Sequence, residues 1–301
     1  MIIKYNTFAK TYNELFSILY QSPVDITCRG KSICYEVLNA QLVFDVDLGI
    51  SIYSHKDTKA FPIKFALAEF VWILAKSNNL TFISKYNKAM LNFSDGSNEL
   101  YGAYGYRLNN QIEGCIKKLE NDIHTRQAFA AIYNDMDIHT VTKDLPCNTS
   151  LQFIIRNNRL YLTVNSRSSD FLTGLSIDAF HWQLLLTLVY NELTPIYSGL
   201  MIGSVTYNIA SLHIYSTDKD IFDSMIDTIQ FQSCYNLYDY TIFIDGQYTD
   251  VTERAINFVD LENRGSTSLT VYDALDLNIC SRSTVNNLYQ IFKDRKYKIT
   301  R

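Results

Sequence analysis

Residues 145–178 read LPCNTSLQFIIRNNRLYLTVNSRSSDFLTGLSID, and this stretch decides the fold. Two runs within it, SLQFIIR and RLYLTVN, are rich in branched and aromatic residues and are joined by Asn157-Asn158, a pair that favours a tight turn. The pattern predicts a β-hairpin. In RLYLTVN the leucines and the valine fall on one face, as expected for a sheet that is buried mainly on one side.

Three chemically demanding side chains lie along this stretch: Cys147, Arg167 and Asp178. Each has an ordinary explanation when taken alone. A lone cysteine is most often a small buried residue, and an Asp before an apolar run is most often a helix N-cap. Brought together by strand ends, a thiol, a guanidinium and a carboxylate could form a reactive site.

Motifs in a fixed order connect this stretch with its surroundings: Pro146-Cys147 followed by Gln152-Phe153, RSSD at 167–170, G-L-x-x-D ending at Asp178, and SLHIY at 211–215. In order and spacing they resemble the thymidylate synthase and deoxycytidylate hydroxymethylase family, over about residues 22–218. VNSRSSD, Asp178, Trp182 and SLHIYS are more similar to the phage-type dCMP hydroxymethylases than to ordinary thymidylate synthases.

The resemblance implies an α+β fold, in which helices pack on a large mixed β-sheet, as a single domain over residues 1–301. It also implies a homodimer formed through the sheet, with active sites shared because each borrows an arginine from the partner subunit. Residues 219–301 diverge from the family. Their pattern predicts a helix at 220–231, a strand at 239–245, a polar loop and a C-terminal amphipathic helix. The final KYKITR does not match the tail that closes over folate in the synthases, so no folate contacts are carried over.

Composition narrows the class of protein. The net charge of −4 gives no basic surface for nucleic acid. The six cysteines form no C-x-x-C pair, and no Cys/His cluster has zinc-ligand spacing, so we expect no metal. The first ten residues lack the apolar core of a signal peptide, and the longest apolar run, 65–75, is too short to cross a membrane. We expect a soluble cytoplasmic protein, in a virus-infected host cell if the phage resemblance holds, with neither nucleic acid nor membrane as partner.

Apolar spacing predicts an amphipathic helix at 8–20, strands within 32–53 and a buried helix at 62–77 that carries Glu69. A buried carboxylate must be paired, or protonated because desolvation raises its pKa. The residues alone favour a structural Glu bonded to a polar neighbour. The resemblance implies instead the glutamate that organises water and relays protons to the base.

Three further site residues come from the resemblance. Arg29, in the loop DITCRGKS, matches a phosphate-binding arginine, although a solvated turn explains the loop equally well. Tyr104, in LYGAYGYR, is placed near the site, and aromatic packing of the loop is an equal alternative. Arg126 matches the first of two adjacent arginines that reach the partner subunit's nucleotide phosphate. Gln127 replaces the second, and an amide offers fewer donors than a guanidinium.

Within the central stretch the resemblance assigns Cys147 as the nucleophile. The nearby Arg167 would depress the pKa of the thiol and raise the thiolate fraction. Ser168 is assigned to phosphate contact and Asp170 to hydrogen bonding on the base side. Asn148 stands where the synthases have histidine, and Ser166 where they have glutamine.

His213 and Tyr215 lie two residues apart on a predicted strand at 204–216, so they point to the same face. A buried, hydrogen-bonded histidine is the usual structural explanation. The resemblance implies that this H-x-Y pair holds the 3′-hydroxyl of the sugar.

Asp178 carries the argument about substrate. The synthases have asparagine at this position, whose amide donates to carbonyl 4 of uracil and accepts from the N–H at position 3. Cytosine reverses both groups. A carboxyl group accepts from the cytosine amino group and, when protonated, donates to its ring nitrogen. A mismatched buried pattern costs several kcal/mol. Asp178 therefore points to cytosine, and it could cap its helix at the same time.

Together these residues predict a pyrimidine carbon-5 one-carbon transferase. The first hypothesis is a dCMP 5-hydroxymethylase that uses 5,10-methylenetetrahydrofolate and a covalent Cys147 adduct. One alternative is a methyl-forming enzyme on dUMP or dCMP. The other is a catalytically idle nucleotide-binding paralogue.

Overall fold

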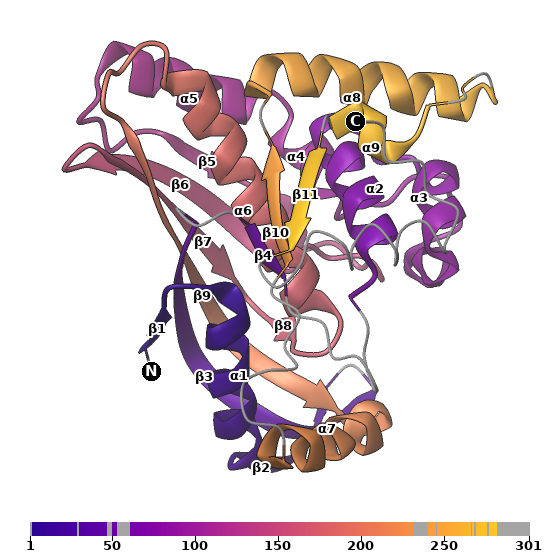
Figure 1. Cartoon of the computed structure of the whole chain (residues 1–301). Coiled ribbons are helices and arrows are strands. Elements are labelled where there is room, and N and C mark those ends of the chain that lie inside the picture. Colours follow the sequence, from indigo (N-terminus) through magenta and orange to yellow (C-terminus); the bar gives the residue numbers. More distant parts are fainter. Residues whose placement is uncertain are drawn as a thin grey trace.

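The computed structural model is built on a curved mixed β-sheet (Figure 1). It describes residues 2–28, 30–46, 50–52, 61–231, 240–244, 246–265, 267, 269–275 and 277–281. Among these, eight strands form the sheet in the order β1-β3-β9-β7-β6-β5, with β2 also pairing with β3 and β8 with β9. The strands are β1 Ile2–Tyr5, β2 Pro23–Cys28, β3 Lys31–Asp45, β5 Phe129–Ala131, β6 Asn148–Arg156, β7 Arg159–Ser166, β8 Ser169–Asp170 and β9 Met201–Tyr215.

Strand directions in this sheet are mixed. β3 is antiparallel to β9, β9 is parallel to β7, and β7 is antiparallel to β6. The predicted α+β fold with a large mixed sheet is confirmed. The central strands meet the helices with an almost fully buried set of apolar side chains, among them Leu151, Phe153, Leu160, Leu162, Val164 and Val205.

The predicted hairpin is confirmed as β6 and β7. Its turn residues Asn157 and Asn158 have φ angles of 52° and 56°. Two successive left-handed residues make the turn whose twist matches that of paired strands, and asparagine tolerates this conformation better than most residues. The turn sets the register from Arg156–Arg159 to Ser150–Asn165, and a shift between Asn148 and Ser150 then pairs Asn148 with Ser166.

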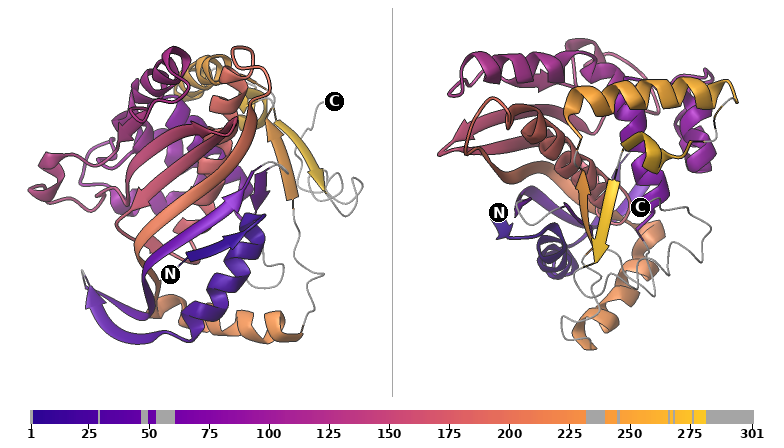
Figure 2. Two further views of the ribbon diagram at one scale, coloured as in Figure 1. Left: turned by 90° about the vertical axis from the view of Figure 1, so that its left-hand side faces the viewer. Right: turned by 45° about the horizontal axis from the view of Figure 1, so that its top comes forward.

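Helices cover one side of the sheet, and the opposite side carries none in the described chain (Figures 1 and 2). α6 packs on β7 and β9, and α1 packs on β3, while α2 and α8 lie against α6 on its outer side. The helices are α1 Phe8–Tyr20, α2 Ile63–Leu74, α3 Leu80–Tyr86, α4 Tyr104–Leu108, α5 Gln111–Asn121, α6 Gly174–Leu193, α7 Lys219–Phe231, α8 Tyr248–Asn263 and α9 Val271–Leu275. α6 is therefore a central helix, which is why apolar residues surround it on nearly every face.

A smaller sheet joins distant parts of the chain. β4 (Ile50–Ile52) pairs with β10 (Tyr240–Ile244), which pairs with β11 (Leu277–Ser281), both antiparallel. The divergent C-terminal part is thus bound to the N-terminal half through backbone hydrogen bonds.

The predicted strands within 32–53 are present as the long β3 and the short β4. One expectation about local structure is wrong, because the polar loop expected after β10 is the helix α8. Within α8 the buried residues Val251, Ala255, Phe258 and Val259 recur at helical spacing among charged residues. The predicted C-terminal amphipathic helix lies outside the described residues.

None of the helices in the described ranges is both long and apolar enough to cross a membrane. Within the same ranges, no three His, Cys, Asp or Glu side chains gather in a way that could hold a metal ion.

Candidate active site

The hairpin brings Cys147 and Arg167 together. Cys147 immediately precedes β6 and Arg167 immediately follows β7, and the antiparallel pairing places these two ends side by side. The Arg167 N–H donates to the Cys147 carbonyl at 2.9 Å. Its guanidinium Nη2 lies 3.6 Å from Cys147 Sγ, and Ser168 Oγ lies 3.7 Å from the same sulfur. The predicted proximity of thiol and guanidinium is therefore present.

Backbone carbonyls hold the Arg167 side chain in place. Nε donates to the carbonyl of Pro146 at 3.0 Å, Nη2 to that of Leu145 at 2.8 Å, and Nη1 to Ser168 Oγ at 3.1 Å. A guanidinium has five N–H groups. With one more pointing at sulfur, one Nη1 hydrogen is left without a partner among the described residues, and it is free for an anion.

The pKa of the Cys147 thiol lies above its ordinary value, because burial penalises the thiolate. The positive charge of Arg167 and the Ser168 hydroxyl oppose this effect, while the charges of Asp178 and Asp144 add to it. Arg167 therefore acts in the predicted direction, but burial outweighs it in the free protein. The thiolate needs further stabilisation, such as a bound substrate that draws the sulfur into a bond.

Asp178 lies one turn inside α6 and faces the same site. Its Oδ2 accepts from Asn148 Nδ2 at 2.9 Å and lies 3.0 Å from the Tyr207 hydroxyl. Burial raises its pKa to about 6, against the lowering effect of these two hydrogen bonds. The expectation that Asp178 could also cap the helix is wrong, because α6 begins at Gly174.

Asp170 hydrogen-bonds the loop just before α6, which has no side-chain cap. Its Oδ1 accepts from the backbone N–H groups of Leu172 and Thr173, both at 2.8 Å. These bonds orient the loop that leads into α6. The role of Asp170 in binding the base remains a prediction.

Glu69 points toward the same region from α2. Its side chain is 21% exposed, and burial raises its pKa to about 8, with the charges of Asp178 and Asp144 contributing. His181 Nε2 lies 3.9 Å from Glu69 Oε2 and 2.8 Å from the Ala66 carbonyl, to which it can donate. Because burial lowers the pKa of His181 to about 4, the histidine is neutral and forms no ion pair with Glu69.

Tyr104, the first residue of α4, lies next to this cluster. The backbone of Asn148 hydrogen-bonds its hydroxyl, and its ring lies 6.0 Å from that of Trp182. Burial raises its pKa, and the charges of Asp178 and Cys147 raise it further. The hydroxyl is therefore a neutral donor over the physiological range.

His213 and Tyr215 lie side by side on β9, with ring centroids 4.8 Å apart. His213 is paired in register with Asp170, and its Nδ1 lies 3.4 Å from Ser211 Oγ. Its Nε2 is buried and has no partner among the described residues. A buried nitrogen left in this way is suited to a ligand hydroxyl.

Of the two remaining predicted residues, the structure describes only Arg126. Arg29 lies outside the described residues. Arg126 is exposed just before β5, away from the residues around Cys147 in sequence, and its backbone carbonyl accepts from Gln152 Nε2 at 2.9 Å. Gln127 accepts from Lys118 Nζ at 3.1 Å.

The sequence analysis missed Tyr207, Asp144 and His181. Tyr207 is fully buried on β9, and its hydroxyl lies 2.8 Å from Asn148 Oδ1. Its place between Val205 and Ile209 on the buried face was a usable signal, because a buried tyrosine hydroxyl needs a partner. Asp144 accepts from the Gly102 N–H at 2.7 Å, and burial raises its pKa to about 6.

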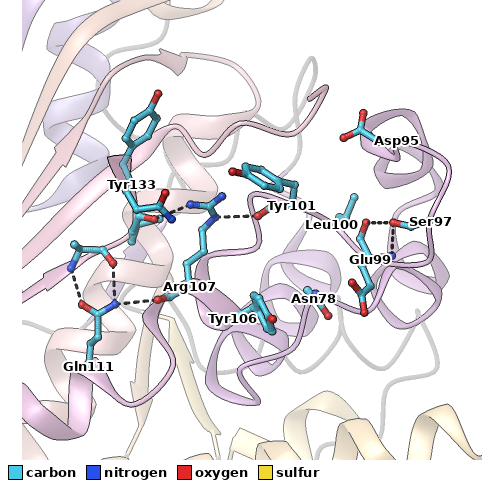
Figure 3. Close-up of a pocket in the computed structure, with 13 residues that line it drawn as sticks. Asn78, Asp95, Ser97, Glu99, Leu100, Tyr101, Tyr106, Arg107, Gln111 and Tyr133 are labelled. Carbon is cyan, nitrogen blue, oxygen red and sulfur yellow. Dashed lines mark hydrogen bonds between the residues drawn. The ribbon is translucent and has the colours of Figure 1, made fainter. Parts of the chain in front are cut away.

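A cavity of about 630 Å³ lies elsewhere, beside α4 and β5 (Figure 3). Arg107 forms part of its wall, but its guanidinium is paired with the buried Asp137 at 2.8 Å. None of the lining residues belongs to the cluster around Cys147. We assign the chemistry to the cluster and not to this cavity.

Comparison with known proteins gives the family and the fold of the chain. The thymidylate synthase family profile matches residues 10–256. The deoxyuridylate hydroxymethyltransferase of Bacillus phage SP01 is 36% identical over 171 residues, which are 51% of this chain and 44% of that protein. This chain thus matches less than half the length of that relative. The thermostable thymidylate synthase A from Bacillus subtilis aligns with a TM-score of 0.63 at 19% identity, over 78% of this chain and 87% of that one.

Proposed function

Because the chain belongs to the thymidylate synthase family, we propose that it transfers a one-carbon unit to carbon 5 of a pyrimidine deoxynucleoside monophosphate. More specifically, we propose a dCMP 5-hydroxymethylase. The observation that carries this proposal is the convergence of the Cys147 thiol, the Arg167 guanidinium and the Asp178 carboxyl, with Glu69 beside them.

Cys147 serves as the nucleophile that adds to carbon 6 of the base, which makes carbon 5 nucleophilic. Arg167 favours the thiolate through its charge, and the rigid carbonyl cradle keeps the guanidinium 3.6 Å from the sulfur. Buried Tyr104 adds a neutral donor near the thiol and the acid. The hydroxyl can hydrogen-bond a base atom whose charge changes on addition.

The family implies 5,10-methylenetetrahydrofolate as donor, which supplies an electrophilic methylene carbon when bound. Glu69 fits this partner chemically, because a carboxyl with a pKa of about 8 carries a proton at neutral pH and can deliver it to a leaving amine. Once the proton has left, the carboxylate can take one from water during hydroxymethyl formation. The residues that would bind the pterin are left unassigned.

Asp178 supports cytosine as the base, because a neutral carboxyl donates to a ring nitrogen and accepts from an amino group. A specific observation favours a second candidate, dUMP. The phage relative is named as a deoxyuridylate hydroxymethyltransferase, and an ionised Asp178 can accept from the N–H of uracil.

For the phosphate we propose the free Nη1 hydrogen of Arg167, Ser168, Arg29, and Arg126 from the partner subunit. His213 and Tyr215 are proposed for the sugar 3′-hydroxyl, with the unpartnered His213 Nε2 as the supporting observation. Asp170 is proposed for the base side of the site, as a neighbour of His213.

Release of tritium from carbon 5 of labelled dCMP and dUMP tests the proposal. We expect release with the wild type in the presence of the folate, and its loss in Cys147→Ala. Cys115→Ala, which removes a buried thiol of α5, is the matched control and should retain release. A mass measurement of the product separates hydroxymethyl from methyl. No release from either nucleotide would leave an idle nucleotide-binding paralogue as the remaining reading.

A further inference from the structure

Asn148 and Tyr207 meet on one oxygen of Asp178. Asn148 Nδ2 donates to Oδ2 at 2.9 Å, and the Tyr207 hydroxyl lies 3.0 Å from Oδ2 and 2.8 Å from Asn148 Oδ1. Both side chains are completely buried. They stand on β6 and β9, on either side of β7, so the sheet itself fixes the distance between them.

The other oxygen of Asp178 is left open. Among the described residues no hydrogen bond ends on Oδ1, whereas Oδ2 faces the Asn148 N–H and the Tyr207 hydroxyl, whose single hydrogen is shared between Oδ2 and Asn148 Oδ1. An amide N–H can only donate, so Oδ2 has to accept from Asn148 in either protonation state. The carboxyl therefore cannot rotate freely, and Oδ1 is the oxygen available to a ligand.

The protonation state of the open oxygen determines which base it matches. An ionised Oδ1 accepts from the ring N–H of uracil. A protonated Oδ1 instead donates to the ring nitrogen of cytosine, which carries no hydrogen at that position. The Asn148 N–H, together with the Tyr207 hydrogen when it points to Oδ2, stabilises the ionised form and opposes the burial that stabilises the neutral one.

We propose that Tyr207 and Asn148 are positioning residues that turn Oδ1 of Asp178 toward the pyrimidine edge and make the choice between cytosine and uracil depend on pH. This inference rests on the proposed function and deepens it. The titratable groups facing Asp178 are Glu69 from α2, Tyr104 from α4, Cys147 before β6 and Tyr207 from β9. Nucleotide binding is measured without folate, so that proton transfers in later steps of the reaction do not affect the pH dependence of binding.

The test is calorimetric binding of dCMP and of dUMP between pH 5 and pH 8.5. In the wild type, the dissociation constant of dCMP should rise about tenfold per pH unit above the midpoint at which Asp178 ionises, whereas that of dUMP should level off above the same midpoint. In Tyr207→Phe the rise should begin roughly one pH unit higher, because the carboxylate has lost a donor. Tyr161→Phe removes a hydroxyl on the opposite face of the sheet and should behave as the wild type does.

Two more measurements test the same proposal without relying on Tyr207→Phe. Asn148→Ala should shift the midpoint in the same direction as Tyr207→Phe. In wild-type protein at pH 7.5, calorimetry in buffers of different ionisation enthalpy should find about one proton taken up with dCMP and none with dUMP.

The outcomes separate the two proposals. If wild-type protein binds and processes a nucleotide but its base preference does not change with pH, or if folded Tyr207→Phe and Asn148→Ala keep the wild-type midpoint, the positioning role is overturned. A purely structural role would weaken both nucleotides equally at every pH. If neither nucleotide binds and no tritium is released, the proposed function itself fails.

Discussion

Burial gives the carboxyl groups of this site their unusual chemistry. It raises the pKa of Glu69 to about 8 and that of Asp178 to about 6, whereas a solvated carboxyl titrates near pH 4. Two acids that stand close together and lose their protons at different pH can take different roles, one as a proton donor and one as a reader of the base.

The same shift predicts how stability depends on pH. The folded chain keeps the Glu69 proton up to about pH 8, while the unfolded chain releases it near pH 4.5. Between these values the folded state binds more protons, so the free energy of unfolding falls as pH rises. Glu69→Gln removes this loss and should be more stable than the wild type at pH 8.5 by roughly 2–4 kcal/mol. Urea unfolding checks it. An equal gain at pH 4.5 would contradict the protonation argument.

Asp178→Asn tests the reading of the base. An amide holds the acceptor and donor pattern that complements uracil, so the variant should favour dUMP over dCMP at every pH. We expect the ratio of the two kcat/KM values to shift by roughly 100-fold toward dUMP, equivalent to a mismatch of about 3 kcal/mol. Competition between the two nucleotides in one reaction, read by product mass, measures the ratio. An unchanged preference would remove the basis for choosing cytosine.

Sequence reasoning reached most of this cluster, but not all of it. Cys147, Arg167 and Asp178 could be predicted because short motifs fix their spacing and a hairpin fixes two of them in space. For Tyr207, the alternation with Val205 and Ile209 indicates burial and hence a partner for the hydroxyl, but it does not identify that partner. Its hydroxyl acquires a partner only when β9 packs under α6, and that distance is not encoded in local spacing.

At the scale of elements, the hairpin of β6 and β7 places Cys147, the proposed nucleophile, beside Arg167. The strands were predictable because the turn residues and the alternation agree. α8 was harder to predict from one sequence, because its charged residues hide a buried stripe.

The hairpin turn yields a prediction of its own. Asn158 is left-handed, with a φ of 56°. In this conformation the Cβ of an alanine lies too close to the following carbonyl oxygen, so Asn158→Ala should lower the free energy of unfolding by about 1–2 kcal/mol. Asn158→Gly is the control and should cost less, because glycine adopts this conformation freely. Equal urea midpoints for the two variants would show that the turn is not under this constraint.

At the scale of the whole molecule, the side of the sheet opposite the helices carries a row of amides. Gln41 Nε2 donates to Asn208 Oδ1 at 2.9 Å, Asn208 Nδ2 to Asn165 Oδ1 at 2.9 Å, and Asn165 Nδ2 to Ser150 Oγ at 3.0 Å. The row crosses β3, β9, β7 and β6. A face of this kind supports our proposal that two chains pair through their sheets.

Mixing inactive variants tests this pairing and the shared site together. If Arg126 acts in the partner's site, a heterodimer of Arg126→Ala and Cys147→Ala contains one complete site. Random exchange of equal amounts should then restore roughly a quarter of wild-type tritium release, because half the dimers are mixed and each has one working site. Lys118→Ala mixed with Cys147→Ala is a control that should show only the activity of its own intact sites. No recovery after exchange would place Arg126 outside the partner's site.

The small sheet of β4, β10 and β11 also limits which sequence changes the chain can accept during evolution. Its strands come from near residue 50 and from beyond residue 239, and α8 packs against the helix that carries Glu69. Substitutions in the C-terminal part that change the packing of α8 on α2 will therefore move Glu69, the acid proposed to transfer protons. Grafting a foreign C-terminal segment onto this scaffold has to reproduce that contact, or the graft will alter the acid even where no substitution touches the pocket.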